Sequence, residues 1–153
     1  MARKFSIPWL RLRAQQSGNA YYYLEIPHSS PKKEIPLGPN REKALLQRQV
    51  LLFKHWQEHP LDKDPLINLL LQYQIVYVPL LDNHVQEENL ASIKRLIKFF
   101  EARDYKISDI DSPRLPTEYL AWRNAKLQLR AKSELSLLKR IVNVATRGWK
   151  QAQ

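Results

Sequence analysis

The sequence lacks cysteine altogether, which excludes disulfide bonds and thiolate metal sites. It has only three glycines, too few for a glycine-rich phosphate-binding loop. No apolar segment of signal-peptide length follows the amino terminus. The most apolar stretch, residues 65–81, is interrupted by Asn68, Gln72 and Gln74 and is too short and too polar to span a bilayer. We therefore expect a cytoplasmic protein with no membrane partner.

Recognisable catalytic motifs are missing as well. No histidine has a second histidine or a carboxylate at the spacing of a known metal site, and no serine lies in a nucleophile-elbow context. The pair Asp109 and Asp111 suits a turn or a helix cap better than acid–base chemistry. We expect no catalytic residue, no metal and no cofactor in this chain.

Acidic residues are scarce relative to basic ones. There are 15 Asp and Glu against 25 Lys and Arg, which gives a formal charge of +10 and a pI near 9.9. Such a surplus favours a polyanionic partner, nucleic acid or an anionic lipid surface. Apolar residues make up 44% of the chain, enough to form a core.

The first part of the chain reads as three strands. Apolar and basic residues alternate over 10–13, a polar turn follows at 17–19, and the tyrosine-rich segment 20–26 favours a second strand. The segment 33–38 is a short third strand, and Pro36 suits an edge position. This pattern predicts a three-stranded antiparallel meander.

The alternation also predicts two faces for this sheet. The outward face is expected to carry Trp9, Arg11, Arg13, Tyr21 and Tyr23. The inward face is expected to carry Leu10, Leu12, Tyr22, Leu24 and Ile26. Arginines and tyrosines on one face suit a DNA groove, whereas the alternative is an amphipathic sheet whose tyrosines merely pack across strands.

A helix is predicted after Asn40, a good N-cap, with Leu45, Leu52 and Trp56 along the stripe that covers the sheet. We expect residues 1–59 to form one module, 60–65 a linker bracketed by prolines, and 66–153 a second module.

The second module reads as four helices. They are predicted at about 66–78, at 86–103, after Ser112-Pro113, and at 133–149. The apolar stripe of the second is predicted to contain Leu90, Ile93, Ile97 and Phe100, and that of the fourth Leu135, Leu138, Val142, Ala145 and Trp149. The expected fold class is α+β, a small three-stranded antiparallel sheet with one helix followed by an all-α four-helix module.

Basic residues gather on the outer faces of two of these helices. Between Arg123 and Lys150 there are eight basic residues and one acidic residue, Glu134. Lys94, Arg95 and Lys98 lie opposite the apolar stripe of the second helix. Solvated helix faces usually mix both signs, so the near absence of carboxylates after residue 123 favours nucleic-acid binding over an ordinary solvated face.

Three segments resemble the amino-terminal half of phage-type tyrosine recombinases (integrases). AYYYLEI…KEIPLGPNREKAL resembles their arm-binding domain. LIKFFEARDYKISDID and KSELSLLKRIVNVATRGW resemble parts of their core-binding, SAM-like domain. The resemblance implies that the sheet enters a major groove at arm sites and that the second and fourth helices of the helical module clasp the crossover site. Glu87 and Glu88 depart from the Ser/Thr/Lys-rich helix start usual in that family, and a favourable interaction with the helix dipole explains them.

Charge and resemblance together predict double-stranded DNA as the partner, with other recombinase protomers on the same DNA. The residues expected to contact DNA are Arg11, Arg13, Tyr21, Tyr23, Lys33, Lys94, Lys98, Arg130, Lys132, Lys139, Arg140, Asn143 and Arg147.

The family's catalytic domain would follow the last helix, and no histidine here is followed by arginine three residues later. We expect the front portion of a longer recombinase or a natural truncation, which binds DNA without cutting it. A truncated integrase-like regulatory protein and, ranked lower, a basic RNA-binding protein are the alternatives.

Overall fold

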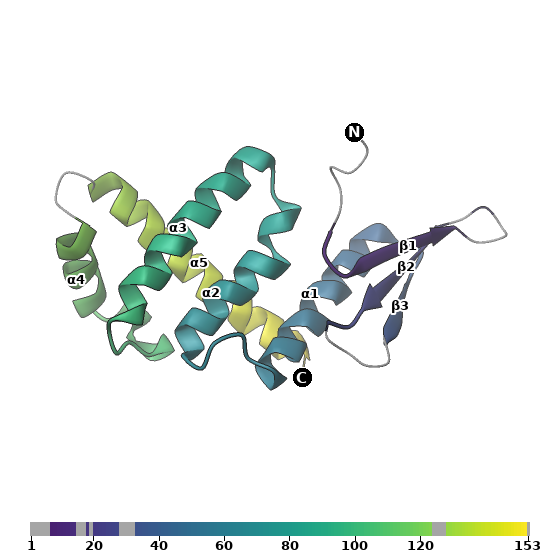
Figure 1. The fold of residues 1–153 in the computed structure, drawn as a ribbon, viewed down its shortest axis with the longest axis horizontal. Helices are drawn as coiled ribbons and strands as arrows, with labels where there is room; N and C mark the ends of the chain where they lie inside the picture. The colour runs from purple at the N-terminus through teal and green to yellow at the C-terminus, as the bar shows by residue number, and fades with distance from the viewer. Residues whose placement is uncertain (1–6, 15–17, 19, 28–32, 124–127, 153) are drawn as a thin grey trace.

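A computed structural model describes residues 7–14, 18, 20–27, 33–123 and 128–152, although the side chains of 128 and 146–152 are not described. It confirms the expected α+β architecture (Figure 1). A small sheet at the amino-terminal end is followed by helices, with α1 between the sheet and the rest.

The sheet is the predicted antiparallel meander, in the order β1-β2-β3. Its strands are β1 (Leu10–Ala14), β2 (Ala20–Glu25) and β3 (Glu34–Gly38). Pro36 lies in the edge strand β3, as expected. Gly38 ends that strand with φ of 95°, a backbone conformation that glycine adopts without steric cost.

Helix α1 (Arg41–Glu58) covers the inward face of the sheet. The Asn40 side chain accepts a hydrogen bond from the Lys43 amide at 2.9 Å, so the predicted N-cap is confirmed. Leu52 and Trp56 are buried with Leu24, whereas Leu45 is only half-buried.

Trp9 does not share the outward face with the arginines, and that prediction was wrong. Its φ is 62°, and its ring contacts the buried Trp56 ring edge-on, with centroids 5.1 Å apart. Trp9 belongs to the turn before β1, and a left-handed residue there breaks the strand alternation that the prediction assumed.

The remaining described residues include the four expected α-helices and two short 3₁₀ helices. In chain order they are α2 (Pro65–Val76), η2 (Val78–Leu80), α3 (Asn83–Glu101), η3 (Ile107–Asp111), α4 (Arg114–Arg123) and α5 (Gln128–Ala152).

Several of the predicted helix bounds were off, and α3 and α5 differ at both ends. Helix α2 ends at Val76 because Pro79 disfavours α-helical backbone before it, and the chain tightens into η2. Helix α3 begins at Asn83, so Glu87 and Glu88 lie beyond its first turn, and the prediction that the helix dipole explains them was wrong. Helix α5 begins at Gln128, five residues earlier than predicted. In α5 the early start buries Ala131 against the core.

Helix α5 holds the helical part together. It contacts α1, α2, α3 and α4, and it passes behind α2 and α3 in Figure 1. At the α4 end, the buried Phe99 ring meets the rings of Phe100, Tyr105, Tyr119 and Trp122 at centroid distances of 5.0–5.6 Å. In the part of the chain that is described, no helix is both long and apolar enough to cross a membrane.

A buried arginine in α1 joins the sheet entrance to the end of α2. The Arg48 side chain donates from Nε to the Pro8 carbonyl at 3.0 Å and from Nη1 to the Val76 carbonyl at 2.8 Å. Burial lowers its pKa to about 10. Val76 also shares the apolar cluster of Leu24 and Trp56. The division into two modules with a linker at 60–65 stays a prediction, but α1 contacts both sides of it.

We expect Arg48→Ala to lower the free energy of unfolding by about 3 kcal/mol, because it removes the donor from the buried Val76 carbonyl and the part-buried Pro8 carbonyl and opens a cavity. Arg48→Met fills the space and should cost less. The exposed Arg41→Ala, on the same helix, is the control and should change stability by no more than about 0.5 kcal/mol. Urea unfolding measures all three, and equal effects of Arg48→Ala and Arg41→Ala would contradict the role of Arg48.

Candidate nucleic-acid interface

One side of α5 carries exposed polar and cationic side chains along about three helical turns. We call this surface the cationic stripe; its members are Lys132, Ser136, Lys139, Arg140 and Asn143, all exposed. Their spacings of three and four residues place them on one face. The buried residues Leu138, Ile141 and Ala145 lie on the opposite face.

The one acidic residue of α5 points away from the stripe. Glu134 is 2% exposed and accepts hydrogen bonds from Tyr119 Oη at 2.5 Å, Arg123 Nε at 2.9 Å and Arg95 Nη1 at 3.0 Å. Three helices thus meet at one carboxylate, α3 through Arg95, α4 through Tyr119 and Arg123, and α5 through Glu134. Burying a carboxylate is costly unless it is paired and hydrogen-bonded in this way.

This cluster changes the assignment of two predicted surface cations. Arg123 was counted in the basic surface, but its side chain is only 12% exposed and is bound to Glu134. Arg95, predicted on the cationic face of the second helix of the helical module, is also bound to Glu134. Sequence reasoning missed the burial of Glu134, although a signal existed, because residue 134 falls in helical phase with Leu138, Ile141 and Ala145.

The cations of the stripe are not neutralised in this way. Lys132 and Lys139 make no ion pair with any residue that the structure describes. Arg140 reaches the hydroxyl of Tyr73 on α2; burial raises the pKa of that tyrosine, and Arg140 opposes the rise. The cationic stripe therefore keeps its charge available for a partner.

A polar groove of about 300 Å³ lies between α3 and α5 beside Glu134. Two arginines and two serines contribute to it, together with Glu88, Ala91 and Glu134; they are Ser92, Arg95, Arg130 and Ser133. Arg130 is exposed and has no ion pair in the described chain. Two carboxylates balance the two arginines of this groove, so it does not extend the positive surface of the stripe.

The predicted contacts on α3 belong to a different surface. Lys94 and Lys98 are exposed, one turn apart, and line a groove formed by α2 and α3, to which no described residue of α5 contributes. Leu90, predicted in the buried stripe, is 39% exposed at this groove, and that prediction was wrong. Leu90 lies close in helical phase to Lys94 rather than to Ile93.

The outward face of the sheet brings the predicted residues together but pairs the arginines with acids. Tyr21 and Tyr23 lie opposite Arg13 and Arg11, and the two tyrosine rings are 5.2 Å apart.

Each arginine of this face bonds a carboxylate, Arg11 to Glu25 at 3.3 Å and Arg13 to Glu34 at 2.6 Å. Two arginines and two glutamates leave no net charge among these four. Lys33 is exposed just before β3. The Arg147 side chain, the remaining predicted contact, lies outside the described side chains.

Comparison of the chain with models of protein families, with curated proteins and with solved structures gives no match. The described residues contain no group of three or more His, Cys, Asp or Glu side chains placed to hold a metal ion.

The Glu134 cluster predicts a pH dependence of stability. Burial, and then the bond to Glu134, raise the pKa of Tyr119 well above its usual value near 10. The unfolded chain releases this proton near pH 10 while the folded chain retains it. The stabilising contribution is therefore complete below pH 10 and declines as the pH rises above it.

We expect the free energy of unfolding to fall above pH 10 by up to about 1.4 kcal/mol per pH unit for this tyrosine. Tyr119→Phe should remove this contribution and flatten the slope. Urea unfolding between pH 8 and 11 measures the slope for both proteins, and identical slopes would contradict the account of the cluster.

Proposed function

We propose that the chain binds double-stranded DNA through the cationic stripe of α5 and does so without catalysis. The observation that supports this most is the arrangement of charge on α5. Three of its four described cations, Lys132, Lys139 and Arg140, lie exposed on one face, and its one carboxylate, Glu134, is buried with three partners on the other. Solvated helix faces usually mix both signs of charge, and this one does not.

The side chains of the stripe suit a duplex. A single α-helix fits the major groove of B-form DNA. In this arrangement Lys132 and Lys139 would neutralise phosphates, and Ser136 would donate to a phosphate oxygen. Asn143 can pair bidentately with adenine and Arg140 with guanine, which gives the same face a means of reading sequence.

Duplex DNA fits the stripe better than RNA. The major groove of A-form RNA is too narrow for a helix, and single-stranded RNA is recognised by aromatic side chains on which bases stack. The described part of the stripe contains lysine, arginine, serine and asparagine but no aromatic residue. Site-specific recombination, with this chain as the DNA-binding front part of a tyrosine recombinase, is our proposed context and rests on the sequence motifs. A truncated integrase-like regulator would use the same surface.

We expect Lys132→Ala/Lys139→Ala to weaken duplex binding and to reduce the slope of log K against log salt by about two, one for each lost phosphate contact. Neither lysine has an ion pair in the described structure, so the fold should be unaffected. Lys43→Ala/Lys63→Ala removes the same charge from exposed positions outside α5 and is the matched control. Fluorescence anisotropy with a labelled duplex, over a series of salt concentrations, measures both.

Equal losses in the two double variants would mean that binding follows net charge alone and would contradict the stripe. Competition with structured RNA of the same length tests the choice of nucleic acid. Stronger competition by RNA than by duplex DNA would favour the RNA-binding alternative.

The sheet is the second proposed DNA surface, and its glutamates make it testable. If the sheet lies against phosphates, Glu25→Gln/Glu34→Gln frees Arg11 and Arg13 and should strengthen duplex binding about tenfold, since the two carboxylates no longer repel the backbone. Glu42→Gln/Glu58→Gln, which removes two exposed carboxylates of α1, is the control for net charge. The same gain in both variants would remove the sheet from the interface.

A further inference from the structure

Helix α2 contains no charged residue. Its sequence, PLINLLLQYQIV, is apolar on almost every side, and a helix of this kind is normally enclosed on all sides. Most of α2 is enclosed by α1, α3 and α5. Leu71 and Gln74, however, are only half-buried. Leu71 still packs against the core, so this side of α2 is only partly covered by the rest of the described chain.

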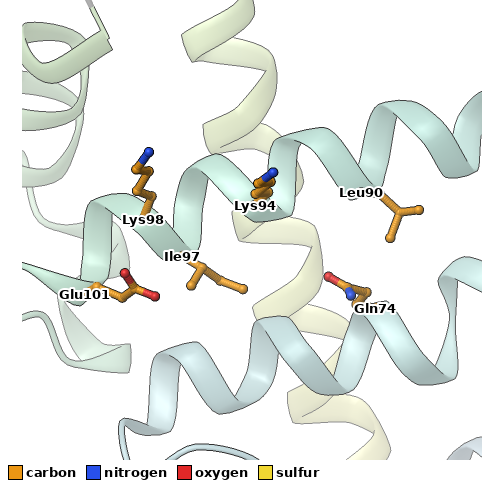
Figure 2. Close-up of a pocket in the computed structure, with 6 residues that line it drawn as sticks. All are labelled: Gln74, Leu90, Lys94, Ile97, Lys98 and Glu101. Carbon is orange, nitrogen blue, oxygen red and sulfur yellow. The ribbon is translucent and has the colours of Figure 1, made fainter.

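This partly covered side forms one wall of a groove of about 440 Å³ between α2 and α3 (Figure 2). Gln74 comes from α2, and the remaining lining residues come from α3; they are Leu90, Lys94, Ile97, Lys98 and Glu101. In Figure 2, Ile97 and Gln74 lie between the two helices, whereas Lys94 and Lys98 extend from α3 on the side away from α2. The groove thus has apolar side chains within it and two cations on its rim.

The geometry points to an acidic amphipathic helix of a partner protein as the occupant of this groove, and we propose it as a protein-docking site. Lys94 and Lys98 are one helical turn apart, so their ammonium groups match carboxylates spaced one turn apart on a helix laid along the groove. Neither lysine makes an ion pair within the described chain. Glu101 closes one end and would repel a carboxylate there, which favours one direction of the bound helix.

Apolar lining separates this partner from DNA. A phosphate backbone would use the lysines but has nothing to place against Leu90 and Ile97. An amphipathic helix uses both, because its apolar side chains fill the groove and its carboxylates meet the rim. The proposal goes beyond the proposed DNA binding and assigns Lys94 and Lys98, expected from the sequence to contact DNA, to a protein partner.

The test uses a capped amphipathic helical peptide of about five turns, long enough to form a helix. It carries leucine at i, i+3, i+4 and i+7 and glutamate along both flanks. A second peptide has lysine in place of each glutamate, and a third has serine in place of each leucine. Titration into the isotope-labelled full chain, followed by NMR, should shift the amides of residues 71–74 and 90–101. The second and third peptides should bind at least about tenfold more weakly.

Three variants separate the groove from the DNA surface. Leu90→Gln and Lys94→Ala/Lys98→Ala should each weaken binding of the acidic peptide about tenfold. Leu90→Gln should leave duplex binding unchanged, because it alters no charge. Leu46→Gln changes an exposed leucine of α1 and is the matched control, with peptide binding unchanged.

Equal binding of the acidic and basic peptides, shifts confined to other elements, or no effect of Leu90→Gln would overturn the docking site. The docking site would also be overturned if duplex DNA displaced the peptide and bound the Leu90→Gln variant more weakly, since the groove would then be a DNA-binding site. Failure of duplex binding in the wild-type chain bears on the proposed function alone, and failure of the peptide bears on the groove alone.

Discussion

The burial of Glu134 determines what α5 shows to solvent. Its carboxylate accepts from Tyr119, Arg123 and Arg95, and these bonds fix the rotation of α5 against α3 and α4. A helix rotated far enough to bring Glu134 to the surface would bury stripe residues such as Lys139 and would strip a buried tyrosine and two arginines of their partner. The same interaction therefore stabilises the helical part and keeps the stripe free of carboxylate.

Three surfaces of the described chain carry cations, and they differ in how these cations are paired. The stripe leaves Lys132 and Lys139 unpaired in the described chain, which suits long-range attraction of a polyanion. On the sheet, Arg11 and Arg13 form ion pairs with glutamates. These ion pairs would have to break before the arginines could bind phosphates, so the sheet suits a weaker, secondary contact with DNA. The α2–α3 groove combines two cations with apolar lining and suits a protein helix.

Periodicity predicted most elements because most of them bury one face, and Leu24 and Leu138 lie where alternation and helical phase place them. Strand β1 is the exception, since Leu12, predicted on the inward face, is exposed. Periodicity failed for residues whose position depends on a contact with a distant part of the chain. From the sequence alone Arg48 is expected to be an exposed helix residue, but it is buried because it donates hydrogen bonds to the carbonyls of Pro8 and Val76. Trp9 does not follow the strand alternation because its backbone is left-handed. Arg123 is not part of the exposed basic surface because it is bound to Glu134. The basic face of α5 could be predicted from helical phase alone, because the exposure of its residues does not depend on a contact with another part of the chain.

Residue-resolved mapping of the DNA contact tests the central claim most directly. An isotope-labelled sample is titrated with a short duplex, and the backbone amide shifts are followed by NMR. We expect the largest shifts in α5 between residues 132 and 143, with the residues that line the α2–α3 groove unchanged. Large shifts elsewhere, with residues 132–143 unaffected at saturating duplex, would contradict the claim.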